Sequence, residues 1–70
     1  MHDLDLTTLR LFVAACDHRN LGRAGEQENI GASAISKRLA QLEAQVHAQL
    51  LARHRRGVVP TAAGEILLEH

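Results

Sequence analysis

Aromatic residues, paired cysteines, long apolar runs and net charge are all scarce or missing in this 70-residue chain. Phe12 is the one aromatic residue, so a core has to be built mostly from Leu, Ile, Val and Ala. Such side chains suit packed helices better than a sandwich of sheets. A chain of this length buries only about 60% of its unfolded surface. We therefore expect one small domain with a core of two or three helices.

The single cysteine, Cys16, has no partner for an internal disulfide, which fits a reducing compartment. No apolar run approaches the roughly 20 residues that a bilayer span needs, and no signal peptide opens the chain. We expect a soluble cytoplasmic protein with no membrane partner. Cys16 itself is expected to be a small buried side chain, as free cysteines generally are.

The net charge of zero hides an uneven distribution. Residues 1–30 carry five acids against three bases, whereas residues 31–60 carry five bases against the single acid Glu43. The five bases are Lys37, Arg38, Arg53, Arg55 and Arg56. A local surplus of this kind can dock on phosphates. A solvated basic face would have the same composition, so charge alone does not decide between the two.

Hydrophobic spacing predicts a first helix over about residues 7–18. The apolar side chains that recur at three- and four-residue steps, and that we expect to form its buried stripe, are Leu6, Leu9, Val13 and Cys16, widened by Leu11 and Phe12. A short second segment follows over residues 20–28. Asn20 is a good N-cap for it, and its two glycines lower helicity but permit close approach of another helix.

Residues 29–31 are typical of a turn, in which Asn29 or Gly31 can take a positive φ. The clearest pattern follows, from Ala32 to Val46, where a stripe suited to burial indicates one long helix. That stripe consists of Ile35, Leu39, Leu42 and Val46. The opposite face presents hydrogen-bonding or cationic groups, namely Ser33, Ser36, Lys37 and Gln41, with Arg38 at its edge, and the first two turns of the helix contain no acid.

Beyond this helix, Leu50 and Leu51, the basic segment 53–57 and the run 58–60 suggest a short hairpin, with Pro60 confining the second strand to an edge. Thr61 can cap a last helix that starts at Ala62 and simply stops at His70. We expect residues 1–60 to form one domain and residues 61–70 to begin a linker helix of a longer protein.

Two helices are expected to be joined by a short turn, and the second is longer and carries polar and basic groups on its outer face. This arrangement predicts a helix-turn-helix. The major groove of DNA is about 12 Å wide and admits one helix, whose N-terminal residues meet base edges. The amino end of the first helix can bind a phosphate. The basic hairpin would act as a wing, with an arginine at its tip suited to a narrow minor groove.

Several segments keep a fixed order over residues 6–64, and together they are specific. They are Leu9-Arg10-Leu11-Phe12-Val13-Ala14, Arg23-Ala24, Ala34-Ile35-Ser36-Lys37-Arg38-Leu39, Leu42-Glu43, Leu50-Leu51-Ala52-Arg53 and Thr61-Ala62-Ala63-Gly64-Glu65. In this order they resemble the N-terminal DNA-binding domain of LysR-type bacterial transcriptional regulators.

The resemblance implies a mainly α fold, a three-helix winged helix-turn-helix with a short two-stranded β wing and the start of a linker helix. It implies sequence-specific binding of double-stranded DNA and a homodimer or tetramer formed through the linker helix in the full-length protein. A small-molecule effector would bind only a separate C-terminal domain. Such a regulator is cytoplasmic and nucleoid-associated, is not an enzyme and needs no cofactor or metal in this domain.

Carried over by position, Ala32, Ser33, Ser36 and Lys37 match base- and phosphate-contacting positions of the recognition helix. Arg56 matches the wing arginine, and Asn20 and Arg23 match positions near the phosphate backbone. The full set of expected DNA-binding residues is Asn20, Arg23, Ala32, Ser33, Ser36, Lys37, Arg38, Gln41, Arg53, Arg55 and Arg56.

The chain departs from the family pattern at four places. Ala32-Ser33 stands where Gln-Pro is usual, and Ala32 cannot make the bidentate contact to adenine that a glutamine makes. Gly31 replaces a Ser or Thr cap, at a cost of a few tenths of a kcal/mol. Glu28 replaces an apolar residue and must turn outward or find a partner. His47 replaces a glycine, but tolerates a positive φ better than most residues.

Other functions have weaker support. The histidines His2, His18, His47, His54 and His70 lack the short spacing of a zinc site. No nucleophile–base pair is visible, and so small a domain has little room for a catalytic pocket. The main rival is a winged helix that binds protein, which the zero net charge and the missing glutamine favour. Against it, the outer face of residues 32–41 offers no large apolar anchor. The apolar start of the last helix also fits a pure oligomerisation module.

Overall fold

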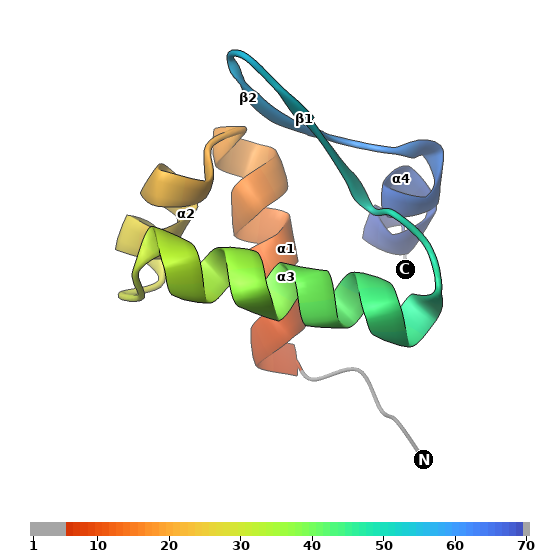
Figure 1. Ribbon diagram of the computed structural model, residues 1–70, viewed down its shortest axis with the longest axis horizontal. Coiled ribbons are helices and arrows are strands. Elements are labelled where there is room, and N and C mark those ends of the chain that lie inside the picture. Colours follow the sequence, from red (N-terminus) through yellow and green to blue (C-terminus); the bar gives the residue numbers. More distant parts are fainter. Residues whose placement is uncertain (1–5, 70) are drawn as a thin grey trace.

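The computed structural model describes residues 6–69 as four helices and a two-stranded antiparallel sheet, drawn in Figure 1. Its elements, in chain order, are α1 (Leu6–His18), α2 (Leu21–Gln27), α3 (Ala32–Val46), β1 (Leu51–His54), β2 (Gly57–Pro60) and α4 (Ala62–Leu68). This order agrees with the expected three helices, hairpin and further helix. His2 and His70, considered above as metal ligands, lie outside the described residues.

The face that α1 buries differs from the one expected from its spacing. Its buried residues are Thr8, Leu11, Phe12, Ala14 and Ala15. Leu6, by contrast, is 76% exposed and Val13 is 43% exposed, so the prediction of a buried stripe through these two was wrong. The physical reason is that α2, α3 and β2 all pack against the face that carries Leu11 and Phe12.

Cys16 is half-buried and packs against the edge of the core, so it is less enclosed than expected. Its burial, together with the neighbouring carboxylate of Asp17, raises the pKa of the thiol above its ordinary value. A thiol in this setting stays protonated at neutral pH and is a poor nucleophile, because the thiolate is the reactive form.

The α2 helix begins and ends through local bonds. Asn20 is its N-cap, as expected, and Oδ1 accepts a hydrogen bond from the Arg23 N–H at 2.9 Å. The turn to α3 spans residues 28–31, and Asn29 takes the positive φ of 62° while Gly31 stays at −72°. Glu28 finds a partner, because its carboxylate lies 3.7 Å from the guanidinium of Arg10 on α1.

The α3 helix agrees with its sequence pattern. Ile35, Leu39 and Leu42 are buried, and Val46 packs half-buried against the same core. No side-chain bond caps its start at Gly31, and its end at His47 adopts the left-handed conformation with φ 56°. Figure 1 shows α3 lying across α1, with the hairpin rising beyond it.

The hairpin pairs Leu51 with Pro60 and His54 with Gly57, which leaves Arg55 and Arg56 at the turn. Its far end is attached to the corner between α1 and α2, because the Val58 N–H donates to the Arg19 carbonyl at 3.1 Å. Thr61 then caps α4, as expected, by accepting a hydrogen bond from the Gly64 N–H at 3.1 Å.

Glu43 fastens α3 to the start of the hairpin. Its Oε2 accepts hydrogen bonds from the N–H groups of Leu50, at 2.7 Å, and Leu51, at 3.1 Å. Both leucines are buried, which limits the access of water to their N–H groups. Removal of the carboxylate would therefore leave these N–H groups without a ready acceptor. The single acid of the basic middle segment therefore has a structural role.

We expect Glu43→Ala to lower the free energy of unfolding by about 2 kcal/mol, since two enclosed N–H groups lose their acceptor. Glu43→Gln keeps an oxygen at the same reach and should cost less than half as much. Urea denaturation followed by circular dichroism measures both variants. Equal stabilities for the two would show that the two N–H groups find water instead.

Candidate nucleic-acid interface

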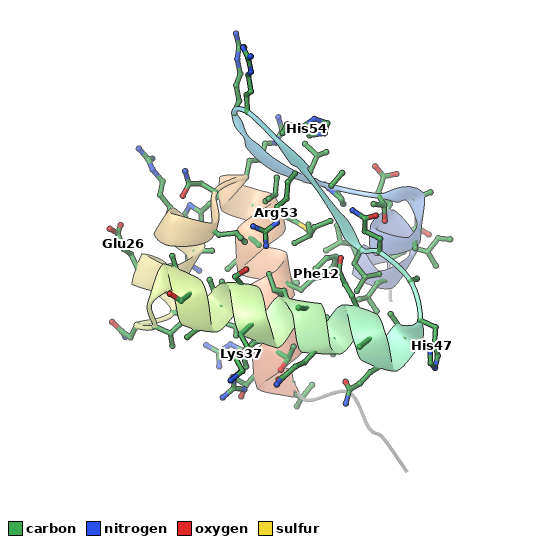
Figure 2. All side chains as sticks on the ribbon, viewed as in Figure 1. Phe12, Glu26, Lys37, His47, Arg53 and His54 are labelled. Atoms are coloured by element: carbon green, nitrogen blue, oxygen red, sulfur yellow. The ribbon has the colours of Figure 1, made fainter. Side chains whose placement is uncertain are left out.

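The expected DNA-binding residues of α3 lie on its solvent side. Ser33, Lys37 and Gln41 are exposed, whereas Ser36 is half-buried. Ala32 and Arg38, the other two residues expected on this helix, are also exposed. Figure 2 shows Lys37 on the side of α3 away from the hairpin. The N-terminal half of α3 thus presents hydroxyl, amide and cationic groups, with no carboxylate before Glu43.

The three hairpin arginines occupy two different places. Arg55 and Arg56 form the exposed turn between β1 and β2. Arg53 instead reaches back to α3, where its Nη2 donates to the Ser36 hydroxyl oxygen at 2.8 Å. Figure 2 shows the labelled Arg53 side chain between the hairpin and α3. The sequence pattern predicted all three arginines on a basic wing and did not distinguish Arg53 from the other two.

Asn20 and Arg23 lie together at the amino end of α2, in a shallow hollow that His18, Glu26 and Gln27 complete. The Asn20 side chain is engaged as the helix cap, which leaves its amide nitrogen for other contacts. His18 Nε2 bonds to Gln27 Oε1 across the hollow. Glu26 lines the same hollow as Arg23, so an acid accompanies the cation here, whereas Arg55 and Arg56 at the hairpin turn have no acid beside them in the sequence.

Two residues that fix the position of the hairpin, Arg19 and Gly57, were not predicted from the sequence. Arg19 takes a left-handed φ of 55°, and this turns its carbonyl toward the Val58 N–H. Gly57 lies against the same carbonyl with φ 138°, so closely that a Cβ would overlap with the oxygen. The glycine after two arginines signals a turn, but nothing local signals that Arg19 lies next to it.

Metal and membrane features are absent from the described part of the chain. Within residues 6–69, no three His, Cys, Asp or Glu side chains lie close enough together to hold a metal ion. Over the same range, no helix is both long and apolar enough to span a bilayer.

Residues 6–65 match the family model described as bacterial regulatory helix-turn-helix protein, lysR family. The nitrogen assimilation regulatory protein nac of Klebsiella aerogenes is 42% identical over 67 residues, which cover 96% of this chain and 22% of that protein. The transcriptional regulator XapR of Escherichia coli K12 is 42% identical over 65 residues, covering 93% and 22%. The chain therefore spans about a fifth of the length of these curated relatives.

Solved structures agree with the sequence matches. A complex of the CbnR DBD with DNA superposes with a TM-score of 0.89 at 30% identity, covering 94% of this chain and 76% of that one. A complex of the BenM DBD with catB site 1 DNA gives a TM-score of 0.88 at 29% identity, covering 94% and 71%. The winged helix-turn-helix fold expected from the sequence is thereby confirmed. The chain belongs to the LysR family of bacterial regulatory helix-turn-helix proteins.

Proposed function

We propose that this domain binds double-stranded DNA sequence-specifically, with α3 in the major groove and the tip of the hairpin at the minor groove. The observation that carries the proposal is the exposed N-terminal half of α3, which offers Ser33, Lys37 and Gln41 without an acid. A helix of this kind fits the major groove, where its first turns meet base edges. The likeness to the CbnR and BenM domains, which were solved in complex with DNA, supports DNA binding by this domain.

Each expected contact has a chemical role in this proposal. Lys37 donates to the O6 and N7 acceptors of guanine or to a phosphate, and Ser33 and Gln41 donate or accept at neighbouring positions. Ala32 offers a methyl group, which suits the methyl of thymine in place of the adenine contact of a glutamine. Arg38, at the edge of the helix, lies where a flanking phosphate can be reached.

The remaining contacts come from outside α3. Arg55 and Arg56 carry two exposed cations on a narrow turn, a shape that suits the strongly negative minor groove of A·T-rich DNA. The Arg23 guanidinium and the Asn20 amide nitrogen are donors for backbone phosphates beside the groove. Arg53 was expected among these DNA ligands, and its bond to Ser36 gives it the different role considered below.

The whole protein is proposed to be a dimeric or tetrameric regulator, in which residues 1–60 bind DNA and residues 61–70 begin the linker helix. Ile66 on α4 is 60% exposed and lies beside Ala63 and Leu67 around an apolar hollow, which suits pairing with a second linker helix. Two such domains would read half-sites about 34 Å apart. The same proposal includes an effector-binding C-terminal domain and a cytoplasmic, nucleoid-associated location. It also includes the absence of catalytic activity.

A salt titration of binding to random DNA duplexes tests the function directly, with fluorescence anisotropy as the readout. We expect micromolar or weaker binding that falls steeply as salt rises, because phosphate contacts release counterions. NMR shifts should cluster on residues 32–41 and 53–57. A folded domain that binds no DNA at low salt would favour the rival, a winged helix that binds protein.

Lys37→Ala is expected to weaken binding to a selected specific site by about 1–3 kcal/mol, if the ammonium group contacts a base. Arg10→Ala is the matched control, because Arg10 also carries an exposed cation but lies on α1 beside Glu28. It should change specific binding little. Equal losses of Lys37→Ala on specific and random duplexes would instead make Lys37 a phosphate contact.

A further inference from the structure

The Arg53 side chain projects from the face of the hairpin that is turned toward the core. It pairs with Val58 across the two strands, and residues that are paired in this way share one face of a hairpin. Val58 is 4% exposed and Leu51, two residues before Arg53, is 8% exposed, so this is the covered face. The direction of the Arg53 side chain therefore follows from the strand register.

The inward direction brings Arg53 over a small recess between β1 and α3. Leu39 and Leu51 line this recess together with Ser36, Arg53 and Glu43, and the Glu43 carboxylate already accepts from the N–H groups of Leu50 and Leu51. The Arg53 side chain borders this recess while remaining exposed, and its Nη2 donates to Ser36 Oγ at 2.8 Å. In the described part of the chain, Arg53 is the only hydrogen-bond partner of the Ser36 side chain.

The bond constrains what Ser36 can offer to a ligand. A serine oxygen carries one hydrogen and two lone pairs, and the guanidinium, which only donates, takes up a lone pair. Hydrogen bonds in a chain strengthen one another, so a hydroxyl that accepts from a cation becomes a better donor. An approaching N–H group is at the same time repelled by the positive charge beside it.

We propose that Arg53 is a positioning residue that orients and polarises the Ser36 hydroxyl, so that α3 presents a hydrogen-bond donor at this point of the groove. The ligand class is a base edge with an exposed acceptor, which means purine N7, guanine O6 or thymine O4. The exocyclic amino group of cytosine is disfavoured. This inference rests on the proposed DNA-binding function and assigns Arg53 to specificity and not to the phosphate backbone.

Selection of binding sites from random duplexes, carried out with the chain and its variants, tests the proposal. Arg53→Met removes the donor and the charge but keeps a flexible stem over the recess. We expect it to relax the base preference at one position of each half-site by about threefold to tenfold, the worth of one hydrogen bond. Ser36→Ala should relax the same position, and the double variant should relax it no further.

Arg55→Met is the matched control, since it removes the same charge from the hairpin tip. It should lower affinity, most strongly for sites with A·T-rich flanks, and leave the preference at the Ser36 position unchanged. Arg53→Lys, which restores a cationic donor, should restore most of the preference. If a purine is preferred there, replacing it by a 7-deazapurine should weaken binding of the wild-type chain and leave Arg53→Met unaffected.

Two results would overturn the inference alone. One is a preference at this position that survives Arg53→Met, and the other is an equal relaxation by Arg55→Met, which would reduce Arg53 to a general cation. A wild-type chain that enriches no sequence from the pool would overturn the proposed function and the inference with it. Thermal melts of each variant show whether a loss of preference reflects unfolding.

Discussion

Gly57→Ala is expected to lower the free energy of unfolding by about 3–5 kcal/mol, through backbone strain and overpacking together. Gly57 has a φ of 138°, a conformation that L side chains rarely adopt. A Cβ at this position would also overlap with the carbonyl oxygen of Arg19. The backbone fixes the positions of both the Cβ and the carbonyl oxygen, so no change of side-chain rotamer relieves the overlap. The hairpin therefore has to move away from the corner between α1 and α2.

Gly31→Ser is the control for this prediction. Gly31 has a φ of −72°, and a Cβ there meets nothing within 4 Å. The serine hydroxyl can also cap α3, which lacks a side-chain cap, so the variant should be as stable as the wild type or more stable by a few tenths of a kcal/mol. Urea denaturation measures both. Backbone strain alone should cost about 1 kcal/mol or more in Gly57→Ala. A smaller loss in the free energy of unfolding would show that the corner between α1 and α2 is loosely packed.

The same substitution should also affect the proposed interface. The Val58 N–H, next to Gly57, donates to the Arg19 carbonyl and holds the base of the hairpin tip. If Gly57→Ala displaces the tip, Arg55 and Arg56 lose their fixed direction while α3 keeps its own. Any variant protein that remains folded should therefore lose more affinity on A·T-rich flanks than at the major-groove positions.

Features that depend on neighbours in the sequence were predictable. The α3 stripe through Ile35, Leu39 and Leu42 follows from steps of three and four residues, and the structure buries all three. The caps at Asn20 and Thr61 depend on a side chain that reaches an N–H three residues later. Such features can be predicted from local patterns, because the interacting groups lie only three or four residues apart in the sequence.

Features that depend on long-range contacts were not predictable. The Arg19 carbonyl meets Val58, and the Ser36 hydroxyl meets Arg53, across separations that no local pattern encodes. The alternation of residues 51–54 places Leu51 and Arg53 on one face of a strand, but it does not tell which face the rest of the chain covers. The role of Arg53 therefore became visible only with the fold.

The first helix shows a further limit of spacing arguments. It carries apolar residues around most of its circumference, so two faces have helical periodicity, one through Leu6, Leu9 and Val13 and one through Leu11, Phe12 and Ala15. The spacing rule identifies a helix in either case but does not choose the buried side. Packing decides it, because the one aromatic ring offers the largest area to bury.

We expect Phe12→Ala to lower the free energy of unfolding by about 3–5 kcal/mol, because a large side chain that is 1% exposed leaves a cavity at the centre of the core. Val13→Ala, one position along the same helix, should cost less than about 1 kcal/mol, since surface substitutions seldom cost more and Val13 is 43% exposed. A domain of this size has a total stability of roughly 4–10 kcal/mol. Phe12→Ala should thus be largely unfolded at moderate urea concentrations where Val13→Ala is still native by circular dichroism. The reverse order would mean that the stripe through Leu6, Leu9 and Val13 is the buried face after all.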